Sequence, residues 1–121
     1  PQLHSIVGSE FLKSIGIMDD VVEAVKKHNP SHNLKRETLL EKALYAVDPL
    51  TGLITACALV KGKKLDNVDK VFVLKRFKEK RFAEGADREQ IASCIEFGLS
   101  LEDFIDIGLT QMKAIKEQLG L

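Results

Sequence analysis

The sequence predicts an all-α fold, a single-domain helical bundle of five to six helices. Apolar residues recur at steps of three and four along nearly the whole chain, and no segment sustains the alternation of a strand. The 121 residues suit one domain with one modest core. A composition of 45% apolar and 30% charged residues is that of a folded protein and not of a disordered one.

The expected helices follow one another from the first residues onward. The first carries an apolar face that includes Leu3, Val7 and Phe11, and it should end near Gly16, since glycine tolerates the positive φ of a helix C-terminus. Asp19 begins the second helix, which leads into a loop rich in turn formers over residues 28–33. This loop should join the second helix to the third.

A third helical stretch begins near Glu37 and extends to about Val60. Asp48 and Pro49 interrupt it, and a kink or break is expected there because proline lacks a backbone donor and clashes with the preceding turn. Capping residues should start the later helices at Asp66, at Asp87 with Gln90, and at Ser100 with Asp103.

The last helix has an apolar seam at alternating steps of four and three: Leu101, Ile105, Gly108, Met112, Ile115 and Leu119. The seam is compatible with a short coiled coil and hence a homodimer through the last helix. It has fewer than three full heptads and contains a glycine, so we favour a helix that packs on its own domain.

Charge and composition restrict the partners and the compartment. Lys+Arg and Asp+Glu are 18 each, so the neutral chain gives no argument for nucleic acid or an anionic membrane. No stretch approaches the roughly 18 uncharged apolar residues that span a bilayer. Cys57 and Cys94 lie among apolar residues, which favours reduced thiols and a cytoplasmic protein. The chain begins with Pro1 and not Met, so we expect it to be processed, trimmed or part of a longer protein.

Basic residues are concentrated between Lys61 and Phe82, called the basic segment below. Nine basic and three acidic residues give it a net charge of +6, and the rest of the chain carries −6. Such a segment can steer phosphorylated substrates or contact a nucleic-acid backbone. We favour a solvated helix face, because charge runs on helices are common. Phe72, Phe77 and Phe82 should then be core anchors.

Three ionisable side chains fall on apolar helix faces. His4 shares a face with Val7 and Phe11, and His28 ends the second helix after two apolar residues. Asp48 follows two leucines at steps of four and eight, so its carboxylate should point toward the core. A buried carboxylate is costly unless it protonates or finds a cation.

Each of these residues also has a structural explanation. A lone histidine on an apolar face is more often a hydrogen-bonded core residue than a ligand, and Asp48 before a proline suits a helix N-cap. Taken together, His4, His28 and Asp48 form a nitrogen and oxygen set suited to a divalent metal such as manganese, iron, zinc, nickel or magnesium. Their separations of 24 and 20 residues match no short ligand motif. Only the fold can bring them together.

Four stretches resemble a known family: HSIVGSEFL at 4–12, VVEAVKKHN at 21–29, LEKALYAVDPLTGLI at 40–54 and FKEKRFA at 77–83. The first two look like the helices that follow the His-Asp pair of HD-domain metal-dependent phosphohydrolases. The third resembles the segment with the family's last metal-ligand aspartate, and the fourth a C-terminal extension of one branch. The resemblance implies one domain over 1–121, with a partial HD-type core in 1–60 and a helical extension in 61–121.

Residue by residue, the resemblance implies that Asp48 is a metal ligand. His4 and His28 match histidines that bind a second metal in binuclear members and line the substrate side in mononuclear ones, which implies a catalytic role for both. The family's first histidine and its His-Asp pair lie upstream of His4, and no His-Asp dipeptide occurs in this chain. At most half of the ligands are therefore expected here, in a fragment of a longer enzyme or in a remnant that binds metal poorly.

The implied activity is hydrolysis of a phosphate ester of a nucleotide or similar small molecule, with a divalent metal ion as cofactor. The competing hypothesis is a catalytically silent helical module that binds a protein partner through its last helix. Nucleic-acid binding through residues 61–82 is the weakest of the three hypotheses, because the chain as a whole is neutral.

Overall fold

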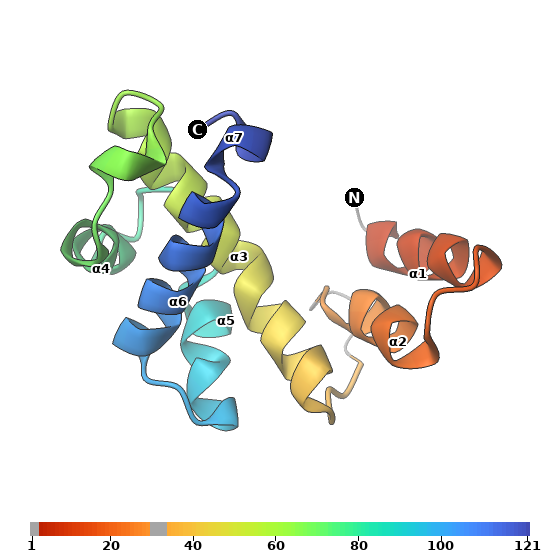
Figure 1. Ribbon diagram of the computed structural model, residues 1–121. Helices are drawn as coiled ribbons and strands as arrows, with labels where there is room; N and C mark the ends of the chain where they lie inside the picture. Colours follow the sequence, from red (N-terminus) through yellow and green to blue (C-terminus); the bar gives the residue numbers. More distant parts are fainter. Residues whose placement is uncertain (1–2, 30–33) are drawn as a thin grey trace.

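The structure, a computed structural model, describes residues 3–29 and 34–121, and these residues are all-helical, which confirms the predicted fold class (Figure 1). The elements are α1 (His4–Ser14), α2 (Asp19–Lys27), α3 (Leu39–Val60), the 3-10 helix η2 (Leu65–Asn67), α4 (Lys70–Lys78), α5 (Arg88–Ala92), the 3-10 helix η3 (Ser93–Phe97), α6 (Leu101–Ala114) and α7 (Lys116–Leu119). The expected last helix is divided, because α6 ends before Ile115 and α7 follows it.

Side-chain caps begin most of the later helices. Asp87 and Ser100 each accept a hydrogen bond from the backbone N–H three residues on, as predicted. The predicted cap at Asp66 is wrong, since Asp69 caps α4 in the same way. Asp66 lies in η2, where its Oδ2 is 2.6 Å from Nζ of Lys116 in α7.

The predicted interruption of the third helix is wrong where it implied a break, because α3 continues through Pro49. Proline cannot donate to the carbonyl of Tyr45, four residues earlier. The buried side chain of Gln90 in α5 donates to that carbonyl instead, with Nε2 at 2.7 Å from the oxygen. Helix α5 thus supplies the hydrogen bond that the proline removes.

The main core surrounds the second half of α3 and draws on α4, α5, α6 and both 3-10 helices. Ile105 and Met112 of the predicted seam are buried in this core, whereas Ile115 and Leu119 at its end are 46% and 42% exposed. The seam thus packs on its own chain in part, and a homodimer through the last helix stays a prediction. At Gly108 the two long helices approach closely, because a Cβ added there would lie 2.8 Å from Leu50 Cδ2.

Helix α3 is the one described helix that is long and apolar enough, by length and composition alone, to cross a membrane. The core helix of a soluble protein passes the same test. The expectation that no stretch approaches such a span is therefore corrected. Contacts with α2, α4, α5 and α6 bury part of α3, whereas Leu39, Leu59 and Val60 are exposed, and a single such helix is weak evidence for a membrane.

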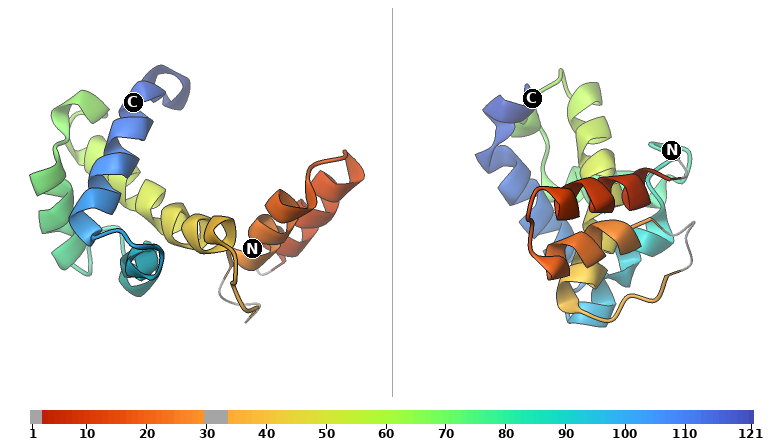
Figure 2. Two further views of the ribbon diagram at one scale, coloured as in Figure 1. Left: turned by 60° about the horizontal axis from the view of Figure 1, so that its bottom comes forward. Right: turned by 90° about the vertical axis from the view of Figure 1, so that its right-hand side faces the viewer.

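The α1–α2 hairpin lies on the other side of the molecule, beside the first half of α3 and away from α4 and α6 (Figure 2). Helix α1 packs on α2 through Ser5 and Ser9, which are buried. The apolar residues Leu3, Val7, Phe11 and Ile15 are 57% to 62% exposed. The apolar face that His4 shares is therefore turned to solvent and not to the core.

Candidate functional site

A cleft of about 590 Å³ lies where the two parts of the molecule meet. The start of α1 and the end of α2 form one wall, the middle of α3 forms its floor, and the turn before α5 forms the opposite wall. The polar lining residues are His4, His28, Asn29, Asp48, Asp87 and Gln90. All three of the residues that the sequence singled out thus line one cleft.

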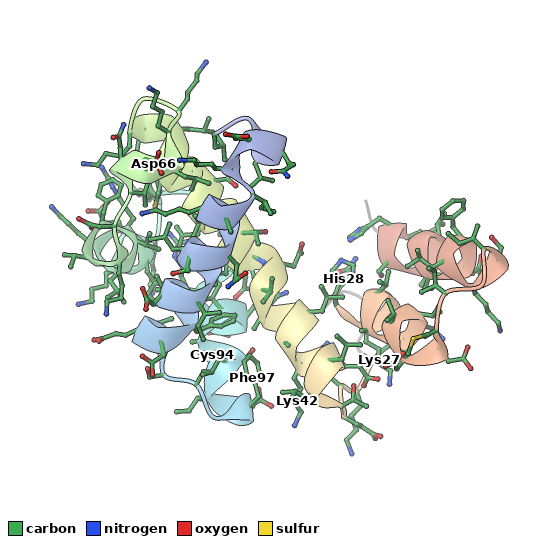
Figure 3. The ribbon with its side chains drawn as sticks, viewed as in Figure 1. Lys27, His28, Lys42, Asp66, Cys94 and Phe97 are labelled. Carbon is green, nitrogen blue, oxygen red and sulfur yellow. The ribbon has the colours of Figure 1, made fainter. Side chains whose placement is uncertain are left out.

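The hairpin brings His4 and His28 into direct contact. Their Nε2 atoms are 3.1 Å apart, and the rings meet edge to face with centroids separated by 5.1 Å. His4 is exposed and His28 is half-buried. Figure 3 shows His28 at the end of α2, close to the start of α1, and His28 lines the cleft.

Neighbouring groups indicate the tautomers of both rings. Nδ1 of His28 lies within hydrogen-bond distance of the Val25 carbonyl, which can only accept, so this nitrogen carries the proton. A neutral His28 then presents an unprotonated Nε2, to which Nε2–H of His4 can donate. Nδ1 of His4 is left to accept from Nδ2 of Asn29 at 3.5 Å.

An ion pair holds the end of α2 that carries His28. Nζ of Lys27 lies 3.1 Å from Oε1 of Glu41, and both side chains are largely shielded from solvent. Backbone N–H donation by Glu37, with a smaller contribution from Lys27, lowers the pKa of Glu41 below its ordinary value. The hydrogen bond to Glu41 raises the pKa of Lys27. Both groups are therefore charged at neutral pH, which fixes α2 on α3.

A single guanidinium organises the opposite wall. Arg88 donates to the carbonyls of residues 76, 77, 79, 82, 83 and 86, which end α4 and form the turn before α5. Burial lowers the pKa of Arg88 from its ordinary value, but an arginine remains charged at any physiological pH. Asp87 and Gln90, at the start of α5, are placed in the cleft by this turn.

The structure corrects the expectation for Asp48. Its side chain is exposed in the cleft and does not point toward the core. Successive residues of a helix are turned by about 100°, so Asp48 lies roughly opposite the buried Ala46 and Leu50. The leucines that suggested burial were a poor guide, because Leu40 is exposed and Leu44 is only half-buried. The carboxylate therefore needs no cation to compensate for burial.

The two histidines fit part of a metal site. Their 3.1 Å separation suits two ligands that each lie about 2.0–2.1 Å from one ion. Over residues 3–29 and 34–121, however, no group of three or more His, Cys, Asp and Glu side chains is arranged to hold a metal ion. The described residues therefore bring two imidazoles and a carboxylate to the same cleft, but not a complete coordination sphere.

Sequence reasoning missed three of the cleft residues. Asn29 is the neighbour of His28, and an amide beside a candidate ligand is a signal that local inspection could have used. Asp87 was recognised only as a helix cap, a role it does have. Gln90 comes from a helix far along the chain, and only the missing N–H of Pro49 hints that a donor is required there.

No protein-family model matches the chain, and no curated protein or solved structure was found to be similar to it. The HD-domain resemblance of the four sequence stretches therefore has no independent support. Function has to be argued from the cleft itself.

Proposed function

We propose that the cleft is part of an HD-type, metal-dependent phosphohydrolase site that acts on a phosphate ester of a nucleotide or similar small molecule. The observation that carries the proposal is the contact between His4 and His28 in a cleft that Asp48 also lines. Imidazole and carboxylate groups are ligands that divalent transition metals use. The four sequence stretches that resemble the family add support, and they assign ligand roles to the same three residues.

Each residue has a definite part in this proposal. His28 binds through Nε2, because a backbone carbonyl engages its Nδ1 and orients the ring. His4 would bind through Nε2 beside it in the tautomer that carries its proton on Nδ1, so metal binding would replace the hydrogen bonds that His4 makes to His28 and Asn29 in this structure. Asp48 supplies a carboxylate from the floor of the cleft. A divalent ion bound there would polarise a phosphoryl oxygen and lower the pKa of a bound water.

The remaining ligands have to come from outside the described residues. The resemblance implies a histidine and a His-Asp pair upstream of His4. A chain of residues 1–121 should then bind metal weakly and hydrolyse no phosphate ester, because water would fill most coordination positions. Its helical circular dichroism should survive chelation, since the apolar core lies apart from the histidines.

Metal binding by residues 1–121 can be measured directly by titration calorimetry with Mn²⁺ and with Zn²⁺. His28→Asn should abolish the binding, and Asp48→Asn should weaken it. Asp20→Asn is the matched control, because Asp20 is an exposed carboxylate at the start of α2 and outside the cleft. Equal binding by wild type and His28→Asn would remove the histidine pair from the proposal.

The activity itself requires a chain that carries the upstream histidine and His-Asp pair. Such a chain should gain tight metal binding and turnover of p-nitrophenyl phosphate together. Asp48→Ala in that chain should lose both while keeping its circular dichroism. An unchanged rate in Asp48→Ala would show that Asp48 has no part in the site.

A further inference from the structure

Each acidic residue of the basic segment already forms an ion pair or a hydrogen bond. Oδ2 of Asp66 is 2.6 Å from Nζ of Lys116, and Oε2 of Glu79 is 2.7 Å from Nη1 of Arg76. Asp69 accepts the N-cap hydrogen bond of α4. None of these three carboxylates forms an ion pair with the other eight basic residues of the segment.

Eight basic side chains of the segment consequently form no ion pair with another described residue: Lys61, Lys63, Lys64, Lys70, Lys75, Lys78, Lys80 and Arg81. All of them are exposed except Lys70, which is half-buried. Lys61 has a partial substitute, since its Nζ lies 4.5 Å from the centre of the Phe72 ring. The surface therefore carries a concentrated positive charge that the protein itself does not balance.

Six of these cations belong to two neighbouring segments: Lys70, Lys75 and Lys78 lie on α4, and Lys61, Lys63 and Lys64 lie between α3 and η2. Val71, Lys75 and Lys78 follow steps of four and three along α4, so they share one face, and all three are exposed. In Figure 3, nitrogen-tipped side chains project from α4 and from the turn above it, on the side away from α1 and α2. Like charges on one helix face repel each other, so the arrangement costs stability that mixed signs would avoid.

We propose that this surface binds the phosphate backbone of a nucleic acid without reading its sequence. The neutrality of the whole chain is no obstacle, because salt screens charges beyond about 8 Å under physiological conditions. The net charge of −6 on the rest of the molecule is thus largely screened from a phosphate backbone that lies along α4. This surface is separate from the histidine cleft, and the inference does not rest on the proposed hydrolase.

The side chains around the cations favour a backbone over the alternatives. Phe72, Phe77 and Phe82 are half-buried against the core, and a Lys or Arg side chain lies over each ring, which leaves little aromatic surface for bases to stack on. Seven of the eight cations are lysines, whose compact ammonium groups on flexible stems bind phosphate as point charges. The only large apolar side chain exposed within the segment is Val71, and a membrane-binding helix needs a broad apolar face.

The test is fluorescence anisotropy with a labelled 20-base-pair duplex of random sequence, in buffer with EDTA so that metal binding cannot contribute. If three or four phosphates are neutralised, affinity should fall roughly 40- to 150-fold between 50 and 200 mM salt. Two duplexes of unrelated sequence should bind equally. Absence of binding at 50 mM salt, or binding that salt does not weaken, overturns the proposal.

Charge reversal locates the surface. Lys75→Glu/Lys78→Glu should lower affinity by at least about tenfold, and Lys75→Arg/Lys78→Arg should retain it. Lys13→Glu/Lys35→Glu is the matched control, with the same change in net charge at exposed lysines outside the basic segment. Equal losses in the two reversed variants, with helical circular dichroism intact, refute the location. Flotation with phosphatidylserine vesicles but no duplex binding would assign the surface to membranes and refute the proposal.

Discussion

Replacing Gln90 with leucine should expose how α3 tolerates an internal proline. The Gln90→Leu side chain keeps a similar volume but removes the donor that lies 2.7 Å from the Tyr45 carbonyl. Gln90 is only 6% exposed, so water has little access to replace it. A buried carbonyl left without a partner costs about 1–3 kcal/mol, and we expect the free energy of unfolding to fall by that amount.

The proline provides an internal control. In a Pro49→Ala background, the new backbone N–H can donate to the same Tyr45 carbonyl within the helix. Gln90→Leu should then cost no more than roughly 0.5–1 kcal/mol, the net value of an ordinary hydrogen bond. Urea unfolding of wild type, both single variants and the double variant, followed by circular dichroism, gives the coupling energy. Equal costs of Gln90→Leu in the two backgrounds would refute the reasoning.

Three further outcomes follow from packing and ionisation. Gly108→Ala should lower the free energy of unfolding by about 1–2 kcal/mol, because its Cβ would clash with the buried Leu50 side chain. Gly52→Ala has open space around it and should raise the free energy of unfolding by up to about 1 kcal/mol. A similar response of the two variants in urea unfolding contradicts this account. The lowered pKa of Glu41 means that its ionised form stabilises the fold, and this contribution to the free energy of unfolding is lost as pH falls below about 5. Glu41→Gln should therefore make stability less dependent on pH on the acid side. An unchanged slope would exclude this role. Burial raises the pKa of Cys57 to about 11, so this thiol should react with iodoacetamide at pH 8 only after unfolding, and rapid labelling of the native protein would disprove its burial.

The exposed stripe of α1 shows where sequence reasoning was misled about burial. A helix whose apolar residues recur at steps of four is usually taken to bury them. Ser5 and Ser9 are buried instead, and α1 lies beside α2 at Gly8, where an added Cβ would make an ordinary contact with Val25 Cγ1 at 3.7 Å. The periodicity identified the helix correctly, but the face that packs depends on the neighbour.

What the sequence by itself determined was local. The helical class, the positive φ of Gly16 after α1, and the caps at Asp87 and Ser100 depend on residues no more than a few positions apart, and all of them are as predicted. Such caps can be recognised in the sequence alone, because the side-chain oxygen and the backbone N–H that donates to it belong to the same helical turn.

The tertiary structure alone decided the cleft. His4 meets His28 because a hairpin reverses the chain between them, and Asp48 is exposed because the core lies on the opposite face of α3. The donor for the Tyr45 carbonyl comes from a residue 45 positions away. Helical periodicity predicts which residues share a face but not which element that face contacts. Which side chains come together in the cleft, and which are buried, therefore follows only from the packing of α2, α3 and α5.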